Sequence, residues 1–303
     1  MSKSNSHKIS HTLTTPWTAD VDPNLPHPEY PRPQMARHHW QNLNGTWAYA
    51  ITGTRKNEGM PKAFPREILV PYPLESALSG VGRQLQPEET LWYHRTFEVE
   101  QAFPEGRTLL HFGAVDWKCK AFLNGEHIGE HIGGYDPFTF DITEALQEGT
   151  NTLVLAVQDP SDSEPIQRGK QVLDPGFIWY TTVSGIWQTV WLEFVPQTYI
   201  ETLQITPEFD DDSVTIQVQV NPKNSGMRFV AEVFDRGERV ASADACPGET
   251  LTLSIADPKS WSPENPFLYD LTVSLLENGD RIDQVQSYFG MRKYSLAPDA
   301  QGR

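Results

Sequence analysis

Residues 111–143 read HFGAVDWKCKAFLNGEHIGEHIGGYDPFTFDIT, and this stretch decides the fold of the first half of the chain. Two short apolar runs, 109–115 and 118–123, have the length of β-strands. The second run ends at Asn124-Gly125, a residue pair that tolerates the positive φ angles of a two-residue turn. The chain then returns through His127-Ile128, so the pattern predicts a β-hairpin.

The composition favours many short strands over helices. The chain has 303 residues with 24 prolines, 21 glycines and 11% aromatic residues, a combination typical of strands joined by tight turns. Its length predicts two domains or one large one, each able to bury a core. The formal charge of −16 and the lack of a basic run argue against nucleic-acid and membrane partners, because such a surface repels phosphate groups and anionic lipids.

The cysteines and the N-terminus fit a reducing compartment. Only Cys119 and Cys246 are present, and they fall in different predicted domains, so a disulfide scaffold is not expected. The first residues, MSKSNSHKISHTLTT, lack an apolar core of signal-peptide length, and no later stretch approaches ~18 continuous apolar residues. We therefore expect a cytoplasmic protein.

Three regions of the first half have distinct patterns. Residues 1–37 are polar and rich in proline, which predicts an extended or disordered arm, because such a segment holds neither a helix nor a central strand. Residues 91–99 alternate with period two and predict a strand with two distinct faces. Residues 159–184 form a long polar segment between two apolar strands, and a loop of that length inside a compact domain is usually functional or disordered.

The character of the sequence changes near Pro196. Only Trp261 of the nine tryptophans lies beyond it, and all nine histidines precede it. Valine and isoleucine alternate with polar residues over 214–220, and Asn278-Gly279 is a strong two-residue hairpin signal. Residues 197–303 therefore predict a second β-sandwich, of the size of an immunoglobulin-like fold.

A set of short motifs in a fixed order resembles the sugar-binding domain of glycoside hydrolase family 2, which includes β-galactosidases, β-glucuronidases and β-mannosidases. These motifs are LNGTW (43–47), VP (70–71), LWY (91–93), FGAVD (112–116), NG (124–125), GGY (133–135), FDIT (140–143) and SGIW (184–187). Downstream, the motifs that resemble the immunoglobulin-like domain of that family are WSP (261–263), PFLY (266–269) and FGMR (289–292). The resemblance covers residues 38–294 and implies an all-β chain. It places a jelly-roll, galactose-binding-like β-sandwich over 38–196 and an immunoglobulin-like β-sandwich over 197–303.

The resemblance also implies a catalytic (β/α)₈ barrel after these two domains. Such a barrel takes about 250 residues, and only about ten residues follow Tyr294 in this sequence. The acid/base glutamate of the family lies in an Asn-Glu pair at the end of a barrel strand, whereas Asn57-Glu58 lies in a polar loop with no apolar strand before it. We therefore expect no catalytic residue in this chain. A partner barrel, in cis or in trans, would carry the two carboxyl groups of a retaining β-glycosidase.

In the family, a loop from the jelly roll helps to close the subsite for the terminal sugar, and residues 159–179 are its counterpart here. Carboxylates in this loop accept hydrogen bonds from sugar hydroxyls, while guanidinium, ammonium and amide groups donate them. The candidate sugar contacts are Asp159, Asp162, Arg168, Lys170 and Gln171. The alternative is that these side chains are ordinary solvated groups of a polar loop.

The same resemblance gives two further candidates. The galactosidase branch has a carboxylate six residues before the glycine of its Ser-Gly-Ile motif, and Trp179 occupies that position here. This departure argues against contacts of the galactosidase type, although an indole ring can stack on the C–H face of a pyranose. Glu75 follows Val70-Pro71 in a turn that approaches the active site in the family. Packing within the sandwich is the alternative for Trp179.

Other residues of the 111–143 stretch have ordinary explanations. Turn residues such as Asp116 and Asn124 bond their own backbone. The three histidines of this stretch are not at ligand spacing on one helix, and no cysteine pair joins them, so we expect no metal site and no cofactor. These histidines are His111, His127 and His131.

Two other functions are compatible with the sequence. A free-standing carbohydrate-binding module needs an exposed aromatic platform, for which Trp179 is the candidate. A structural module, or one that forms a homo-oligomer, needs no ligand at all, since β-sandwiches often support their neighbours without binding anything. The tryptophans and the long polar loop of the first domain favour a ligand-facing surface, and a terminal β-linked sugar is the expected ligand.

Overall fold

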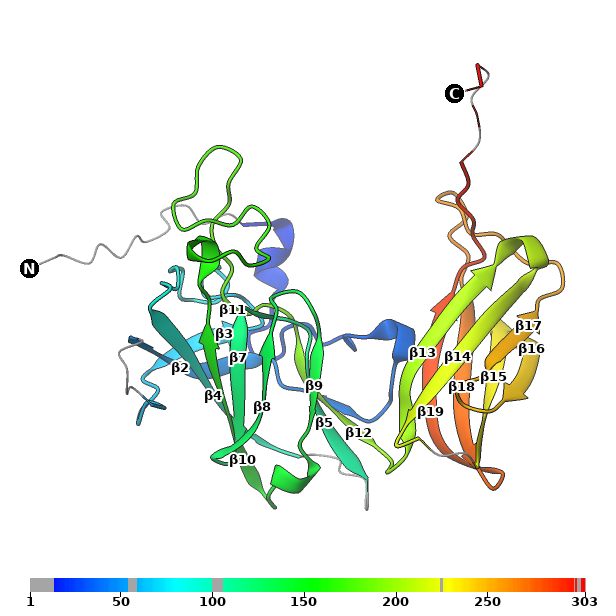
Figure 1. The fold of residues 1–303 in the computed structure, drawn as a ribbon, viewed down its shortest axis with the longest axis horizontal. Helices are drawn as coiled ribbons and strands as arrows, with labels where there is room; N and C mark the ends of the chain where they lie inside the picture. The colour runs from blue at the N-terminus through cyan, green and yellow to red at the C-terminus, as the bar shows by residue number, and fades with distance from the viewer. Residues whose placement is uncertain are drawn as a thin grey trace, which may run out of the picture. The chain divides into compact units, whose positions relative to one another are not determined.

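The computed structural model describes residues 14–53, 59–99, 106–223, 226–296, 298 and 301–302. The described chain consists of antiparallel β-strands and short 3₁₀-helices (Figure 1), which confirms the all-β prediction. None of its helices is long and apolar enough to cross a membrane. The chain divides into two compact units. The first contains residues 14–31 and His39–Phe194, and the second contains Arg32–His38 and the residues from Val195 onward.

The first unit is a sandwich of a four-stranded sheet, in the order β1-β12-β5-β9, and a six-stranded sheet, in the order β3-β2-β4-β10-β7-β8. A short pair, β11-β6, lies beside them. The strands are β1 (Trp40–Asn42), β2 (Gly45–Gly53), β3 (Arg66–Val70), β4 (Glu89–Glu98), β5 (Arg107–Phe112), β6 (Val115–Asp116), β7 (Lys118–Leu123), β8 (Glu126–Ile132), β9 (Phe138–Asp141), β10 (Thr150–Gln158), β11 (Gly185–Ile186) and β12 (Val190–Val195).

The hairpin predicted from Asn124-Gly125 is present between β7 and β8. Asn124 has φ +53° and Gly125 has φ +87°, the positive values that the turn needs. The amide of Asn124 also donates to the carbonyl of Ala145 at 2.9 Å, next to the 3₁₀-helix η3 (Thr143–Ala145). The turn residue therefore fixes both the hairpin and the loop beside it.

Side chains from both large sheets form one core in the first unit. Trp47 is fully buried, and its indole N–H donates to the carbonyl of Leu43 at 2.9 Å. Its ring meets that of the fully buried Tyr93 edge to face at 6.1 Å. A buried indole needs a partner for its N–H group. The hydrogen bond to Leu43 and the contact with Tyr93 therefore determine how Trp47 is oriented in the core.

The second unit is a sandwich of a three-stranded sheet, β13-β14-β17, and a four-stranded sheet, β16-β15-β18-β19. The Asn278-Gly279 hairpin predicted from the sequence joins β18 to β19, with φ +53° and +93°. The strands are β13 (Tyr199–Glu208), β14 (Ser213–Asn221), β15 (Met227–Asp235), β16 (Glu238–Ala245), β17 (Thr250–Ser254), β18 (Tyr269–Glu277) and β19 (Asp280–Phe289), and η5 (Phe209–Asp211) lies between β13 and β14.

The proline-rich arm contributes to both units. Residues 1–13 lie outside the described part of the chain; 14–37 include η1 (Pro16–Asp20) and η2 (Pro33–Met35). Within the second unit, Met35 belongs to the core, and the Arg37 guanidinium donates to the carboxylate of Asp283 at 2.5 Å. Most of the described arm is exposed, and it is anchored at its end by the buried Met35 and Arg37. The boundary between the units follows Phe194.

Candidate functional site

The long loop 159–184 connects β10 to β11 and projects from one end of the first sandwich (Figure 1). Its middle is held by its own backbone. The N–H of Val172 donates to the carbonyl of Tyr180 at 3.0 Å, and the N–H of Tyr180 donates to the carbonyl of Lys170 at 2.9 Å. Gln171 and Tyr180 form an isolated bridge at this point. The loop therefore has a defined conformation in spite of its length.

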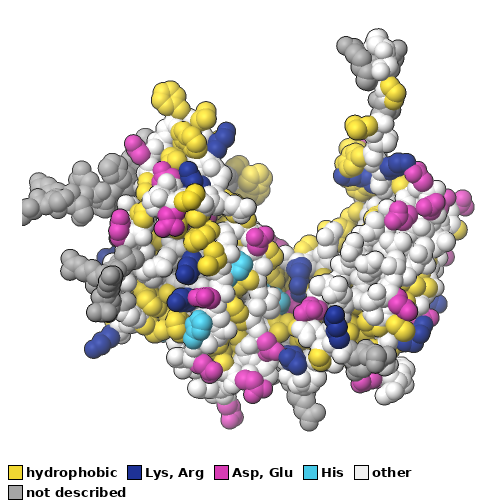
Figure 2. All heavy atoms as spheres, viewed as in Figure 1, with side chains coloured by type: hydrophobic (Ala, Val, Ile, Leu, Met, Phe, Trp, Pro, Cys, Tyr) yellow, Lys and Arg dark blue, Asp and Glu magenta, His cyan; other side chains and the backbone are white. Residues whose placement is uncertain are grey.

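The tip of the loop carries exposed hydrophobic side chains. Trp179 is 46% exposed, Tyr180 is 67% exposed, and Phe177 and Ile178 next to them are exposed as well. Figure 2 shows hydrophobic side chains gathered at this end of the first unit. Contiguous exposed aromatic groups in a soluble domain mark a surface that meets a ligand or another chain.

The two ends of the loop are tied together below this tip. The hydroxyl of Ser184 donates to Oδ2 of Asp159 at 2.7 Å, across 25 residues of sequence. The N–H of Ser161 donates to Oδ1 of the same carboxylate, also at 2.7 Å. Asp159 is only 3% exposed. Its carboxylate therefore closes the base of the loop from inside the protein.

Glu75 makes the second tie at the base. Its Oε1 accepts from the N–H of Leu85 at 3.3 Å and from the hydroxyl of Thr182 at 3.2 Å, and its Oε2 accepts from the N–H of Ser184 at 2.8 Å. The side chain is 5% exposed. One carboxylate thus joins the turn after β3 to the returning end of the loop.

A third buried carboxyl group lies close to these two. Asp116, at the end of β6, is 3% exposed, and a Cβ placed on Gly134 would lie 2.6 Å from its carboxyl group. Burial, followed by the charges of Asp159 and Glu75, raises the pKa of Asp116 to about 8. Burial also raises the pKa of Glu75 to about 7, against the opposing effect of its N–H donors, and raises the pKa of Asp159. The cluster therefore retains protons near neutral pH.

This cluster makes stability depend on pH. Carboxyl groups with a raised pKa hold protons in the folded state that they release in the unfolded state, so their contribution to stability is present at low pH and is lost as the pH rises toward about 8. We expect the free energy of unfolding, measured with urea, to fall between about pH 5.5 and 8, by about 1.4 kcal/mol per pH unit for each group that keeps its proton only in the folded state. Asp116→Asn should flatten this slope, and an unchanged slope in the variant would contradict the assignment.

The remaining predicted contacts differ in their surroundings. Asp162 accepts from the N–H of Leu173 at 3.2 Å, so it supports the loop itself. The amide of Gln171 donates to the hydroxyl of Tyr135 at 3.2 Å, and its carbonyl accepts from the N–H of Val183 at 2.6 Å. These two side chains also order the loop.

The two cationic candidates differ in their exposure. The Nε of Arg168 is buried and has no hydrogen-bond partner in the described part of the chain. The side chain of Lys170 is exposed. The structure therefore brings Glu75 and Asp159 together at the base of the loop. The cationic candidates and Trp179 lie between the two ends of the same loop.

Sequence reasoning did not single out the partners of these carboxylates. Thr182 and Ser184 are small polar residues without a distinctive pattern, although Ser184 begins the SGIW motif. Asp116 was expected to bond its own backbone, whereas the structure buries its carboxyl group in the cluster. Among the described residues, no group of three or more His, Cys, Asp or Glu side chains is placed so that it could hold a metal ion. Of the three histidines considered, His111 and His131 stack on Trp191 and Phe138.

Comparison with known proteins gives a consistent family assignment for both units. Residues 69–196 match the model described as "Glycosyl hydrolases family 2, sugar binding domain", and residues 198–292 match the model described as "Glycosyl hydrolases family 2". A protein of Formosa agariphila named for the β-glucuronidases is 34% identical over 269 residues, which cover 84% of this chain and 31% of that protein. A β-galactosidase of Thermoanaerobacter pseudethanolicus is 28% identical over 219 residues, which cover 69% of this chain and 29% of that protein.

Solved structures show the same fold. The β-glucuronidase of Bifidobacterium dentium, complexed with coumarin-3-O-glucuronide, aligns with a TM-score of 0.68 at 21% identity, over 87% of this chain and 50% of that one. An FMN-binding β-glucuronidase from Faecalibacterium prausnitzii aligns with a TM-score of 0.64 at 23% identity, over 86% of this chain and 40% of that one. The chain spans about 30% of the length of the two curated relatives described above.

Proposed function

This chain belongs to glycoside hydrolase family 2, as its sugar-binding domain followed by its immunoglobulin-like domain, and on that premise we propose that it is the sugar-contacting, non-catalytic part of a β-glycosidase. The observation that carries the proposal is the consecutive match of both domain models over 69–196 and 198–292. The hydrolysis of a β-linked sugar then requires a (β/α)₈ barrel, in cis or in trans. The two carboxyl groups of a retaining mechanism, about 5–5.5 Å apart, belong to that barrel.

The long loop is the part of this chain that we propose to meet the terminal sugar. Its tip offers the exposed ring of Trp179 for stacking on the C–H face of a pyranose. The exposed Lys170 and the half-buried Arg168 are the donors that we propose for sugar hydroxyls or for a carboxylate of the substrate. In this arrangement the loop forms one wall of the subsite, and the barrel forms the rest.

Glu75 and Asp159 have a different role in this proposal. Both are almost completely buried, and the oxygens of both already accept hydrogen bonds from the base of the loop. We assign them as positioning residues that fix where Trp179 and Arg168 lie. Asp162 and Gln171 act in the same way from within the loop.

The coding region in the source genome tests the proposal. An open frame that continues past codon 303 into an apolar strand ending in Asn-Glu, or a neighbouring gene that encodes such a barrel, is the expected result. The absence of both would contradict the proposal, because the family chemistry then has no polypeptide to carry it.

A second candidate function is a free-standing carbohydrate-binding module, which the exposure of Trp179 and Tyr180 favours. On this reading the loop tip binds glycan without a barrel. Aromatic platforms of this kind bind a sugar through its apolar face.

Retention on an affinity gel distinguishes this second candidate. If the loop tip binds glycan alone, Trp179→Ala should weaken retention of the chain in a gel that contains a β-linked glycan by about tenfold, because the stacking platform is removed. Trp17→Ala is the matched control, since Trp17 is also exposed but lies in η1, outside the loop. Equal retention of wild type and Trp179→Ala would exclude the module.

A further inference from the structure

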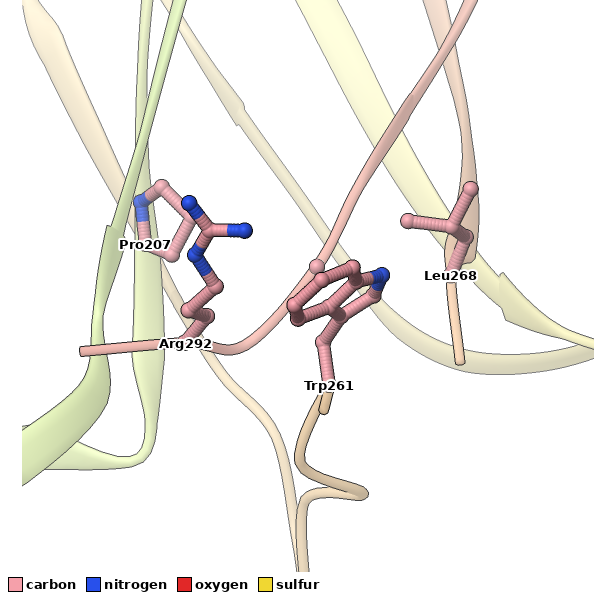
Figure 3. Close-up of a pocket in the computed structure, with 5 residues that line it drawn as sticks. Pro207, Trp261, Leu268 and Arg292 are labelled. Carbon is pink, nitrogen blue, oxygen red and sulfur yellow. The ribbon is translucent and has the colours of Figure 1, made fainter. Parts of the chain in front are cut away.

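The second unit contains a pocket that is separate from the loop of the first unit. Its volume is about 300 Å³, and its lining residues are Pro207, Trp261, Leu268, Gly290 and Arg292. Figure 3 shows Arg292 between Pro207 and Trp261, with Leu268 beyond the indole. The backbone brings these segments together, since the N–H of Trp261 donates to the carbonyl of Met291 at 2.9 Å.

The guanidinium of Arg292 contacts two aromatic rings. Its central carbon lies 4.6 Å from the ring centroid of Trp261 and 4.1 Å from that of Tyr294. Cation–π contacts use the face of a guanidinium, whereas hydrogen bonds to a ligand use the N–H groups at its edge. The two ring contacts therefore restrict a side chain that is exposed and otherwise flexible, and its edge N–H groups remain available to a ligand.

No carboxylate pairs with Arg292 anywhere in the described ranges, whereas its neighbour Lys293 pairs with Asp210. Acidic residues are plentiful in this chain, with 40 Asp and Glu against 24 Lys and Arg. None of those in the described ranges pairs with Arg292. A planar fork of N–H donors matches the two oxygens of a carboxylate. The guanidinium edge of Arg292 therefore offers the donor half of a bidentate ion pair.

The walls of the pocket restrict the ligand further. Apart from the guanidinium and the indole N–H of Trp261, which only donate, the lining side chains are apolar. A neutral sugar needs acceptors as well as donors, and a doubly charged phosphate needs more positive charge than one arginine supplies. The volume lies at the lower end of the range for ligand pockets, which limits the body of the ligand to one small ring or chain.

We propose that this pocket of the second unit is a carboxylate-binding site, in which Arg292 pairs with the carboxylate and Trp261, Leu268 and Pro207 contact the apolar body that carries it. Two sources share this chemistry. One is a small free carboxylic acid, and the other is an acidic side chain of a polypeptide docked on the domain. The site is independent of the proposed sugar-contacting role of the loop.

Titration of the full chain, followed by NMR at the Arg292 Nε–H and Trp261 indole N–H signals, tests the proposal. Phenylacetate should give a saturable shift of both signals, and phenylacetamide, which has the same shape without the charge, should bind at least about tenfold more weakly. In Arg292→Met the Trp261 indole signal is the remaining readout, and its saturable shift should be abolished. Arg281→Met, at the far end of β19 and also exposed, should leave the shifts of both signals unchanged.

A second probe distinguishes the two sources of the carboxylate. N-acetyl-glutamyl-phenylalanine amide carries the acid as a polypeptide does, so tighter binding of this probe than of phenylacetate assigns the pocket to a docked chain, and the reverse order assigns it to a free acid. The proposal is overturned if neither probe saturates, if the amide binds as well as the acid, or if Arg292→Met binds like wild type with its other signals unperturbed.

Discussion

Replacing Glu75 with alanine is expected to lower the free energy of unfolding by about 3 kcal/mol, because the substitution removes the acceptor of three hydrogen bonds at a buried position. The N–H groups of Leu85 and Ser184 lose their partner, and each buried donor left unpaired costs about 1–3 kcal/mol. Water entering the space left by the side chain limits the total. Chemical denaturation at a pH below the raised pKa of Glu75, and again above it, measures the loss.

The same substitution should loosen the loop before it unfolds the domain. Amide hydrogen exchange over 160–183 is expected to accelerate in Glu75→Ala, because the returning end of the loop is tied through Thr182 and Ser184 to this carboxylate. Glu75→Gln keeps the shape and one acceptor and should cost about 1 kcal/mol. Glu67→Ala, at an exposed position of β3, is the control and should stay within about 0.5 kcal/mol of wild type. Unchanged hydrogen exchange and unchanged stability in Glu75→Ala would contradict the assignment of Glu75 as the residue that ties the base of the loop.

The parts of the fold that the sequence predicts are those fixed by neighbouring residues. Both Asn-Gly pairs form the expected hairpins, because the positive φ angles of such a turn are a local requirement. The alternation over 214–220 likewise forms β14, whose apolar side chains enter the second core. Period-two patterns need no information about distant segments, since they follow from the geometry of a strand.

The surroundings of the candidate site depend on contacts that local patterns do not contain. Glu75 lies in a polar turn and was predicted to face a ligand, yet its partners Thr182 and Ser184 are more than one hundred residues away and bury it. Asp116 is buried by the same long-range packing, which brings it near Asp159. The burial of Met35 in the arm was likewise not predicted from local sequence. The segment is rich in proline and was predicted to be extended or disordered, but the Met35 side chain enters the core of the second unit. Charge and exposure at these positions follow from tertiary structure, so composition and spacing do not determine them.

Gly185→Ala is expected to lower the free energy of unfolding by at least about 3 kcal/mol, because two independent costs meet at this residue of the SGIW motif. Gly185 has φ +86°, a conformation that an L side chain rarely adopts. A Cβ there would lie 2.1 Å from the hydroxyl of Tyr93, whose oxygen accepts from the N–H of Ile186 at 3.1 Å. The methyl group must therefore displace a fully buried ring at the centre of the first core.

The double variant separates these two costs. Tyr93→Phe removes the nearest atom of the clash, so Gly185→Ala should cost less in that background than in wild type, by about 1 kcal/mol or more, while the cost of the positive φ remains. Gly176→Ala is the matched control, since Gly176 lies in the loop before β11 and a Cβ on it meets nothing within 4 Å. Thermal unfolding of the four proteins of the cycle gives the coupling. Strict additivity would mean that the Tyr93 hydroxyl does not restrict this position, and the glycine of the motif would then be required by its backbone conformation alone.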